Sequence, residues 1–237
     1  IRNADTRSGQ HGVGKIQPFR PVGIEHSRHG KTHAHQHTCQ HQGDLRADSF
    51  ADQAAEKRAQ AEKILRREME KHPDLPEVIV GAEVFYFSGI AESSVLPELR
   101  LGDTNYILIE MPTVYWTERM YKDLENIWRK QDLIPVVAHV DRYITPWRTH
   151  RIPERLAELP VLVQANASFF TSNSTRRTAM RLLKQRRIHL LGSDCHDLTH
   201  RPPNLGDAVA LIQKKFGPEM ISWINSQEEE VWESRNI

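Results

Sequence analysis

Five short runs of β-branched and other apolar residues recur along the chain from residue 77 onward, and helical stretches alternate with them. Because these runs carry few polar residues on either face, they are typical of parallel strands that helices cover on both sides. Three helical stretches lie between or after them, at 117–131, 174–187 and 205–217. Repeated strand and helix units predict an α/β fold, either a barrel or a doubly wound sheet. The five runs are EVIVGAE (77–83), YILIEMP (106–112), LIPVVAHVDRY (133–143), PVLVQANAS (160–168) and RIHLLGSDCH (187–196).

The front of the chain has a different character. Residues 1–48 hold more than half of the 13 histidines and few apolar residues, and they show neither helical nor strand periodicity. Residues 51–71 are rich in strong helix formers, and His72 followed by Pro73 ends the predicted helix. We therefore expect an irregular N-terminal segment over 1–48 and one domain over 49–237.

Composition narrows the class of protein. With 237 residues, 38% of them hydrophobic, the chain is long enough for one globular domain with a substantial core. The net charge of +1 lacks the basic excess of a dedicated nucleic-acid binder, and no apolar stretch is long enough to cross a membrane, so neither partner is expected. Two cysteines, Cys39 and Cys195, cannot build a disulfide framework, which favours a cytoplasmic protein. The sequence starts at Ile1, so the lack of a signal peptide carries little weight.

Each apolar run ends in a polar residue that could serve catalysis or metal binding. At the carboxyl ends of parallel strands such residues share one face, where α/β enzymes build their active sites. Taken alone, each is more often a solvated residue or a helix cap, but their recurrence in five strands favours a common site. Three carboxylates gathered there would repel one another without cations, and mixed carboxylate and imidazole ligands suit Mn²⁺, Fe²⁺ or Zn²⁺. The residues are Glu83, Glu110, His139, Asn166, Asp194 and His196.

Two arginines near these positions suggest what the metals act on. Arg142 in HVDRY and Arg201 beyond the Asp-x-His pair can hold a phosphate with two parallel hydrogen bonds. A site with two or three metal ions activates water and clamps the oxygens of a phosphate ester. In contrast, the basic residues of 174–187 are interpreted as a solvated helix face without a functional role. Tyr115, Trp116 and Trp147 are interpreted as packing residues.

The stretch from Cys195 to Arg201 permits a second phosphate chemistry. Its Cys-x5-Arg spacing is that of phosphatases with a thiolate nucleophile, whose loop wraps the anion in backbone N–H groups. The loop contains no glycine, Asp197 would repel phosphate, and Pro202 with Pro203 removes two donors. The metal interpretation is therefore favoured over the thiolate one.

The motifs GAEVFY, LIEMP, IPVVAHVDRY, VQANAS, SDCH and RPPNL, in this order, resemble those of the polymerase-and-histidinol-phosphatase (PHP) superfamily. They are most similar to the bacterial manganese-dependent tyrosine phosphatases of capsule and exopolysaccharide gene clusters. The resemblance covers about Pro76 to the C-terminus. It implies a distorted seven-stranded β/α barrel, similar to a TIM barrel, with a metal cluster at its C-terminal face.

The resemblance also implies a reaction and a partner. The protein would be a hydrolase with two or three Mn²⁺ ions, or alternatively Fe²⁺, Zn²⁺ or Mg²⁺. It would remove phosphate from tyrosine on a cognate bacterial tyrosine kinase that regulates capsule or exopolysaccharide synthesis. A histidinol-phosphate-type phosphatase or a nuclease of the same superfamily remains an alternative, and a homo-oligomer is compatible with either. The implied roles are a bridging ligand in Glu83, further ligands in Glu110, His139, Asp194 and His196, and phosphate binders in Arg142 and Arg201.

The chain departs from the family pattern at its front. The family begins with an Asp-x-His-x-His motif on its first strand and places another histidine after its second strand. Here no apolar strand precedes any histidine of KTHAHQHTCQH, and the spacing to Glu83 makes His41 the candidate for the second histidine. A truncated or frame-shifted start would produce this pattern. A third hypothesis is therefore a catalytically impaired remnant with fewer metal ions, its first strands missing or irregular. The histidines concerned are His33, His35, His37 and His41.

Overall fold

The computed structural model describes residues 56–57, 59–75, 77–144 and 151–234 of the chain. Residues 59–69 are helical, which confirms the described part of the helix predicted over 51–71. An ion pair between Glu62 and Arg66, one turn apart, supports this helix on its exposed side. The segment 1–48, with all of the N-terminal histidines, lies outside the described residues.

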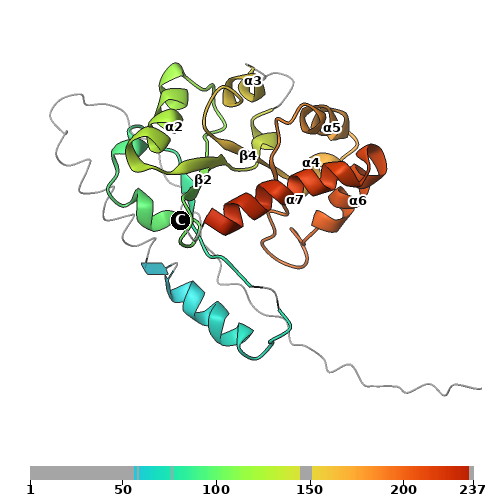
Figure 1. Ribbon diagram of the computed structural model, residues 1–237, viewed down its shortest axis with the longest axis horizontal. Coiled ribbons are helices and arrows are strands. Elements are labelled where there is room, and N and C mark those ends of the chain that lie inside the picture. Colours follow the sequence, from blue (N-terminus) through green and yellow to red (C-terminus); the bar gives the residue numbers. More distant parts are fainter. Residues whose placement is uncertain (1–55, 58, 76, 145–150, 235–237) are drawn as a thin grey trace, which may run out of the picture. The chain divides into compact units, whose positions relative to one another are not determined.

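Five parallel strands form one sheet in the order β1-β2-β3-β4-β5, with helices around it (Figure 1). Because neighbouring strands run parallel, each connection is a crossover that carries the chain back along the sheet. The α/β fold expected from the alternating pattern is confirmed for the described residues. The strands are β1 (Glu83–Phe85), β2 (Tyr106–Glu110), β3 (Ile134–Val137), β4 (Leu162–Asn166) and β5 (Leu190–Gly192).

Strand β1 differs from its prediction. The apolar run 77–83 was expected to be a strand that ends at Glu83, but the described strand begins there. Residues 80–82 bond instead to the irregular segment before β2, since Gly102 N–H donates to Val80 and Ala82 N–H donates to Leu99. The apolar residues 78–82 are therefore half-buried without forming a ladder with β2.

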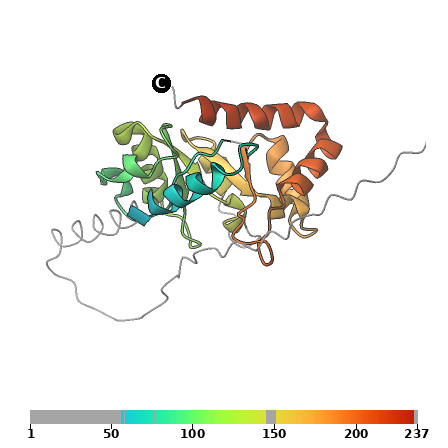
Figure 2. The ribbon, with the colours of Figure 1, turned by 90° about the horizontal axis from the view of Figure 1, so that it is seen from below.

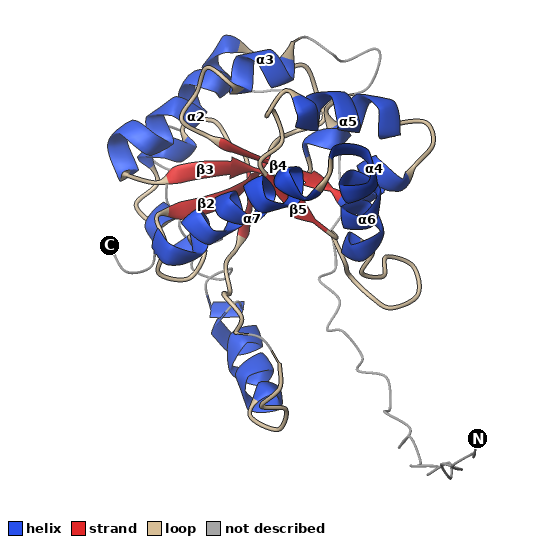
Figure 3. Cartoon of the chain, turned by 45° about the vertical axis from the view of Figure 1, so that its right-hand side comes forward, coloured by secondary structure: helices blue, strands red, loops and turns tan. Residues whose placement is uncertain are grey.

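Helices pack around the sheet (Figure 3). Helix α2 (Glu118–Gln131) packs against β3. Further along the chain α4 (Ala167–Thr171) contacts β4, α5 (Arg176–Lys184) and α6 (Leu205–Phe216). The short helix α3 (Ile152–Leu156) precedes β4. The helices predicted at 117–131, 174–187 and 205–217 are thus confirmed.

Helix α7 (Pro218–Glu233) has no counterpart among the predicted elements. Gly217, with φ 83°, ends α6, and Pro218 begins α7, so the two helices meet at one residue (Figure 2). Helix α7 packs against α6 and β5 through Met220 and Ile224. Because the C-terminal half of α7 is polar, the sequence pattern did not predict this helix.

The core lies between the strands and these helices. Ile107 and Ile109 of β2 are completely buried, and Met120, Leu124 and Ile127 of α2 belong to the same core cluster. This spacing places the three side chains on one face of the helix, and burying each contributes about 1.5–3 kcal/mol. Trp116 is buried beside Tyr121 and Tyr143, which confirms its packing role; Trp147 lies outside the described residues.

None of the described helices combines the length and the apolar character that crossing a bilayer requires.

Candidate metal and phosphate site

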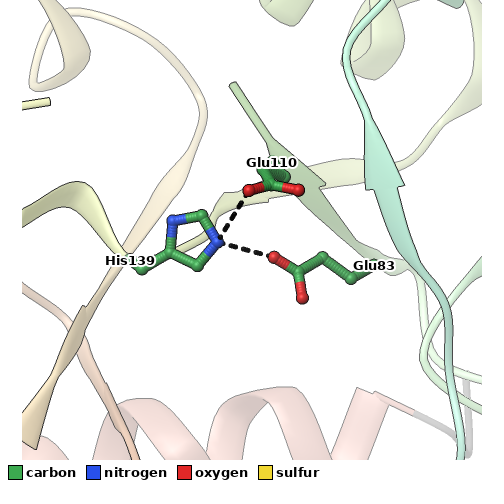
Figure 4. A group of neighbouring side chains, drawn as sticks. All are labelled: Glu83, Glu110 and His139. Atoms are coloured by element: carbon green, nitrogen blue, oxygen red, sulfur yellow. Dashed lines mark hydrogen bonds and ion pairs between the residues drawn. The ribbon is translucent and has the colours of Figure 1, made fainter. Parts of the chain in front are cut away.

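Three side chains from consecutive strands converge near the carboxyl ends of β2 and β3 (Figure 4). Glu83 begins β1, Glu110 ends β2, and His139 follows β3. His139 Nε2 lies 2.6 Å from Glu83 Oε1 and 3.5 Å from Glu110 Oε1. One donor atom from each residue lies within 4.8 Å of the others. Two carboxylates and one imidazole at this spacing form a cluster able to hold a divalent cation.

The imidazole of His139 is held from behind by Tyr143. His139 is buried, with 3% of its surface exposed, and its Nδ1 lies 3.2 Å from the Tyr143 hydroxyl. That hydroxyl accepts the N–H of Met111, and burial raises the pKa of Tyr143, so the phenol stays neutral. When Nε2 binds a cation, the ring proton must lie on Nδ1 and point to Tyr143, as is usual behind metal-binding histidines.

The backbone at two predicted ligands has a rare conformation. His139 has φ 31° and Asp194 has φ 52°, both in the left-handed region. Such angles cost of order 1 kcal/mol or more in residues other than glycine and occur preferentially at functional sites. The N–H of His139 donates to the side chain of Gln164 on β4, which holds this turn in place.

A second group of side chains lies around Asp194, in the loop that follows β5. The Asp194 carboxylate accepts hydrogen bonds from Arg201 and, at 3.3 Å, from the Asn166 amide at the end of β4. Arg201 also lies 3.0 Å from His196 Nε2. His196 is more than half exposed, whereas only 15% of the Asp194 side chain is exposed. The Asp-x-His pair and Arg201 are therefore neighbours, as the sequence indicated.

Arg142 joins the two groups. Its guanidinium lies 3.1 Å from Glu110 Oε1 through one nitrogen and 2.6 Å from Asp194 Oδ2 through the other. The first nitrogen is also 3.2 Å from His139 Nε2. The guanidinium thus offsets the repulsion among the clustered carboxylates, and the same fork is suited to a phosphate.

The electrostatics fit a cation as well. The hydrogen bond to His139 holds the pKa of Glu83 below its usual range, although partial burial acts in the opposite direction. Glu83 is consequently an ionised oxygen donor beside an imidazole nitrogen. This mixed donor set suits first-row divalent cations, and it contains no thiolate.

The structure of the loop after β5 argues against Cys195 as the nucleophile of a thiolate phosphatase. Its sulfur is exposed and lies 3.7 Å from the Asp197 carbonyl oxygen. The Asp197 carboxylate accepts the backbone N–H groups of Thr199 and His200, which lowers the pKa of Asp197. The donors that a thiolate phosphatase would turn toward phosphate are therefore already bound to a carboxylate of this loop.

The described residues bring together all of the predicted site except His41, which lies outside them. Two supporting residues were missed at the sequence level, Tyr143 and Gln164. Gln164 could have been noticed as a polar residue in the middle of a buried strand, VLVQANAS. Tyr143 carries no such signal in the sequence. The short helix η3 (Val140–Arg142) brings its hydroxyl close to the His139 ring.

Known proteins resemble the chain over most of its length. The family model described as "Capsular polysaccharide synthesis, CpsB/CapC" matches residues 39–231. Tyrosine-protein phosphatase CpsB of Streptococcus agalactiae serotype III (strain NEM316) is 26% identical over 165 residues, 66% of this chain and 68% of the relative. Tyrosine-protein phosphatase YwqE of Bacillus subtilis (strain 168) is 29% identical over 177 residues, 69% of this chain and 65% of the relative.

A solved structure has the same fold. It comes from the crystal structures of YwqE from Bacillus subtilis and CpsB from Streptococcus pneumoniae, described as unique metal-dependent tyrosine phosphatases. The TM-score is 0.66 at 22% identity, and the match covers 76% of this chain and 74% of that chain. The arrangement of strands and helices is therefore shared.

Proposed function

Because the chain belongs to the CpsB/CapC family of capsular polysaccharide synthesis proteins, we propose that it is a metal-dependent phosphatase of phosphotyrosine proteins. The observation that carries this proposal is the cluster of Glu83, Glu110 and His139 with two arginines beside it. Relatives named as tyrosine-protein phosphatases, similar over two thirds of the chain, support the choice of substrate. The reaction is hydrolysis of a phosphate monoester.

In this proposal the carboxylates and imidazoles hold the cations. Glu83, Glu110 and His139 form one set, and Asp194 with His196 forms a second, with Glu83 as a bridge. Divalent cations, when bound, supply Lewis-acid stabilisation of the phosphoryl oxygens and an acidified water. Tyr143 keeps the His139 ring oriented, and Gln164 keeps its backbone turned toward the site.

The two arginines are proposed to bind the phosphate. Arg142 and Arg201 both contact the Asp194 carboxylate, so their guanidinium groups lie close together on one side of the cluster. A phosphoryl group placed there would meet two planar forks of N–H donors. Charge that grows on its oxygens in the transition state would be stabilised by groups already in place.

An exposed aromatic ring beside the cluster favours an aryl ester. Phe85 follows Glu83 by two residues on β1, so both side chains lie on the same face of the strand. Phe85 pairs in register with Glu110, and 57% of its surface is exposed. A large exposed apolar side chain at this place can stack on the phenyl ring of phosphotyrosine.

The finer features follow the family. We propose Mn²⁺ as the metal, a bacterial tyrosine kinase as the substrate, and a role in capsule or exopolysaccharide synthesis. We also propose a seven-stranded barrel to which the described sheet contributes five strands. The division at residue 48 and a role of His41 as a ligand are part of the same proposal, as is the alternative of an impaired remnant with fewer metal ions.

Metal removal tests the proposal directly. Chelation of divalent cations is expected to abolish hydrolysis of phosphotyrosine peptide, and Mn²⁺ is expected to restore it. Cys195→Ser is expected to leave the rate nearly unchanged, because Cys195 is outside the cluster. Activity that survives chelation but is lost in Cys195→Ser would contradict the metal mechanism. Metal counting by elemental analysis on the same samples tests the remnant hypothesis.

A comparison of substrates separates the related activities. We expect turnover of a phosphotyrosine peptide to exceed that of histidinol phosphate and of single-stranded DNA. Preference for histidinol phosphate would indicate a small-molecule phosphatase, and preference for DNA would indicate a nuclease.

A further inference from the structure

The basic residues of α5 line a groove on the outside of the sheet. Its volume is about 710 Å³, and the C-terminal end of α6 forms the opposite wall. Arg177, Arg181 and Lys184 recur at the spacing of one helix face and are exposed, as the sequence predicted for this helix. The cations of this basic groove are Arg176, Arg177, Arg181, Lys184, Lys214 and Lys215.

None of these six cations has a carboxylate partner within the described ranges. Arg176 instead donates to the backbone carbonyl oxygens of Phe170 and Thr171 at the end of α4. No aspartate or glutamate lines the groove, and none occurs in the sequence from 159 to 193. Since the whole chain carries a net charge of only +1, the groove is a local concentration of like charges that an anionic partner would relieve.

The floor of the groove indicates which anion fits. Met180, Leu211 and Phe216 lie between the two basic walls and are half-buried. A small hydrated anion makes no favourable contact with apolar residues at the bottom of the groove. The flat surface of a bilayer cannot reach those recessed residues. A peptide that alternates acidic and apolar side chains can meet the walls and the floor at once.

We propose that the basic groove docks an acidic segment of the protein substrate, separate from its phosphotyrosine. The proposal rests on the proposed phosphatase function for the identity of the partner. The groove shares no residue with the cluster of Glu83, Glu110 and His139, so docking and catalysis are distinct contacts of one substrate. Docking raises the local concentration of phosphotyrosine at the site and lowers KM.

Binding is tested without catalysis by fluorescence anisotropy. The probe is a fluorescein-labelled 14-residue peptide of alternating Glu and Leu, titrated with the full chain. Reversal of three charges, Arg177→Glu with Arg181→Glu and Lys184→Glu, is expected to weaken binding about 10-fold or more, consistent with the loss of several ion pairs. The matched control reverses three exposed charges elsewhere, Lys63→Glu with Arg67→Glu and Lys122→Glu, and should bind as the unchanged chain does.

A milder variant keeps the test decisive if the triple reversal fails to fold. Arg181→Gln with Lys184→Gln removes two charges without adding opposite ones and is expected to give a smaller loss in the same direction. Equal binding by groove and control variants would overturn the proposal. Groove-dependent binding of phosphatidylserine vesicles or of single-stranded DNA, with no binding of the peptide, would overturn it in favour of a lipid or nucleic-acid surface.

Kinetics link docking to the substrate. A phosphotyrosine peptide that carries the acidic segment is expected to have a lower KM than the same peptide without it, with kcat unchanged. The triple groove variant should lose this advantage and hydrolyse the short peptide normally. If neither peptide is hydrolysed, the proposed function has failed while the anisotropy result stands. If both are hydrolysed with equal KM, the docking proposal has failed alone.

Discussion

At the scale of single residues, the geometry of the candidate site depends on two side chains outside the predicted ligand set, Tyr143 and Gln164. The Tyr143 hydroxyl accepts the N–H of Met111, the residue after β2, and lies 3.2 Å from His139 Nδ1. One hydroxyl therefore connects the end of β2 to the imidazole that follows β3. Gln164 accepts the His139 N–H from the neighbouring strand. Because both contacts fix the histidine and not the cation, their removal should alter metal affinity before it alters the fold.

Tyr143→Phe tests this interpretation. Loss of the hydroxyl leaves His139 Nδ1 without its partner, and outer-sphere losses of this kind lower metal affinity about 10- to 100-fold. Isothermal titration with Mn²⁺ should show that drop, while the thermal unfolding midpoint changes little. Unchanged Mn²⁺ affinity would mean that Tyr143 is a packing residue only. Tyr121→Phe, another buried phenol that packs beside Trp116, serves as the control.

Phe85→Ala tests the aromatic contact with the substrate. Since Phe85 is exposed beside Glu110, its removal should cost little stability and should reduce kcat/KM for phosphotyrosine peptide about 10-fold, the size of one aromatic contact. Hydrolysis of an alkyl phosphate such as phosphoserine peptide should be unchanged. An equal loss for both esters would show that Phe85 supports the site in general.

At the scale of elements, the pairing of β4 with β5 positions the second half of the site. Asn166 pairs with Gly192, so the Asn166 amide and the Asp194 carboxylate, two residues further on, lie within 3.3 Å. Asp141 accepts the Asn166 N–H at 2.9 Å, and burial raises the pKa of this aspartate. The turn after β3 is thereby tied to β4, and β4 to the loop after β5.

Gly192→Ala perturbs this pairing at one atom. A Cβ at position 192 would lie 2.1 Å from Gln164 Nε2, so the Gln164 side chain must move away from the His139 N–H. We expect a loss of about 1–3 kcal/mol in the free energy of unfolding, as for other overpacked sites, and weaker Mn²⁺ binding. Urea denaturation measures the first effect and isothermal titration the second.

A second glycine gives the matched control. Gly206 lies in the first turn of α6 with no atom near its missing Cβ, so Gly206→Ala should be neutral or slightly stabilising. If Gln164 is the obstacle, Gly192→Ala costs less in a Gln164→Ala background. Additive losses in that double-mutant cycle would place the strain elsewhere.

At the scale of the whole molecule, a half-buried histidine makes stability depend on pH. His189 Nδ1 accepts the Val163 N–H at 3.0 Å, and its ring lies 6.1 Å from that of Trp223 on α7. Burial lowers the pKa of His189 from its ordinary value of 6.5, because the charged ring is poorly solvated there. The imidazole therefore holds β4, β5 and α7 together in its neutral form.

The sign of the effect follows from the lowered pKa. Below about pH 6.5 the unfolded chain takes up a proton that the folded His189 resists, so the free energy of unfolding is largest above this pH and falls as the pH is lowered. Urea denaturation between pH 5 and pH 8 should show this slope, and His189→Gln should flatten it. His200→Gln, at an exposed histidine, should keep it. A slope unaffected by His189→Gln would assign the dependence to other groups.

Residue type and periodicity were enough to determine several features of the protein. The buried β2 run, the amphipathic α2 stripe and the polar residues that follow the strands are local properties, so the α/β class, four of the five strand positions and the set of candidate ligands could be read from the sequence. The lack of glycine, the acidic Asp197 and the two prolines after Arg201 also favoured the metal interpretation over a thiolate at Cys195. These features depend on neighbours within a few residues, where the backbone periods of 2 and 3.6 apply.

Only the tertiary structure decided the rest, because it depends on register and on backbone turns between distant segments. Residues 78–82 of the apolar run are half-buried and precede the ladder, and the C-terminal half of α7 is polar, so neither element could be assigned from its pattern. The strands had to pair before Arg142 could lie between Glu110 and Asp194. The helices had to pack before α5 could face the basic end of α6 across a groove. A sequence specifies which groups are available, whereas distances of about 3 Å between groups from separate strands arise only after long-range pairing has set where each strand ends.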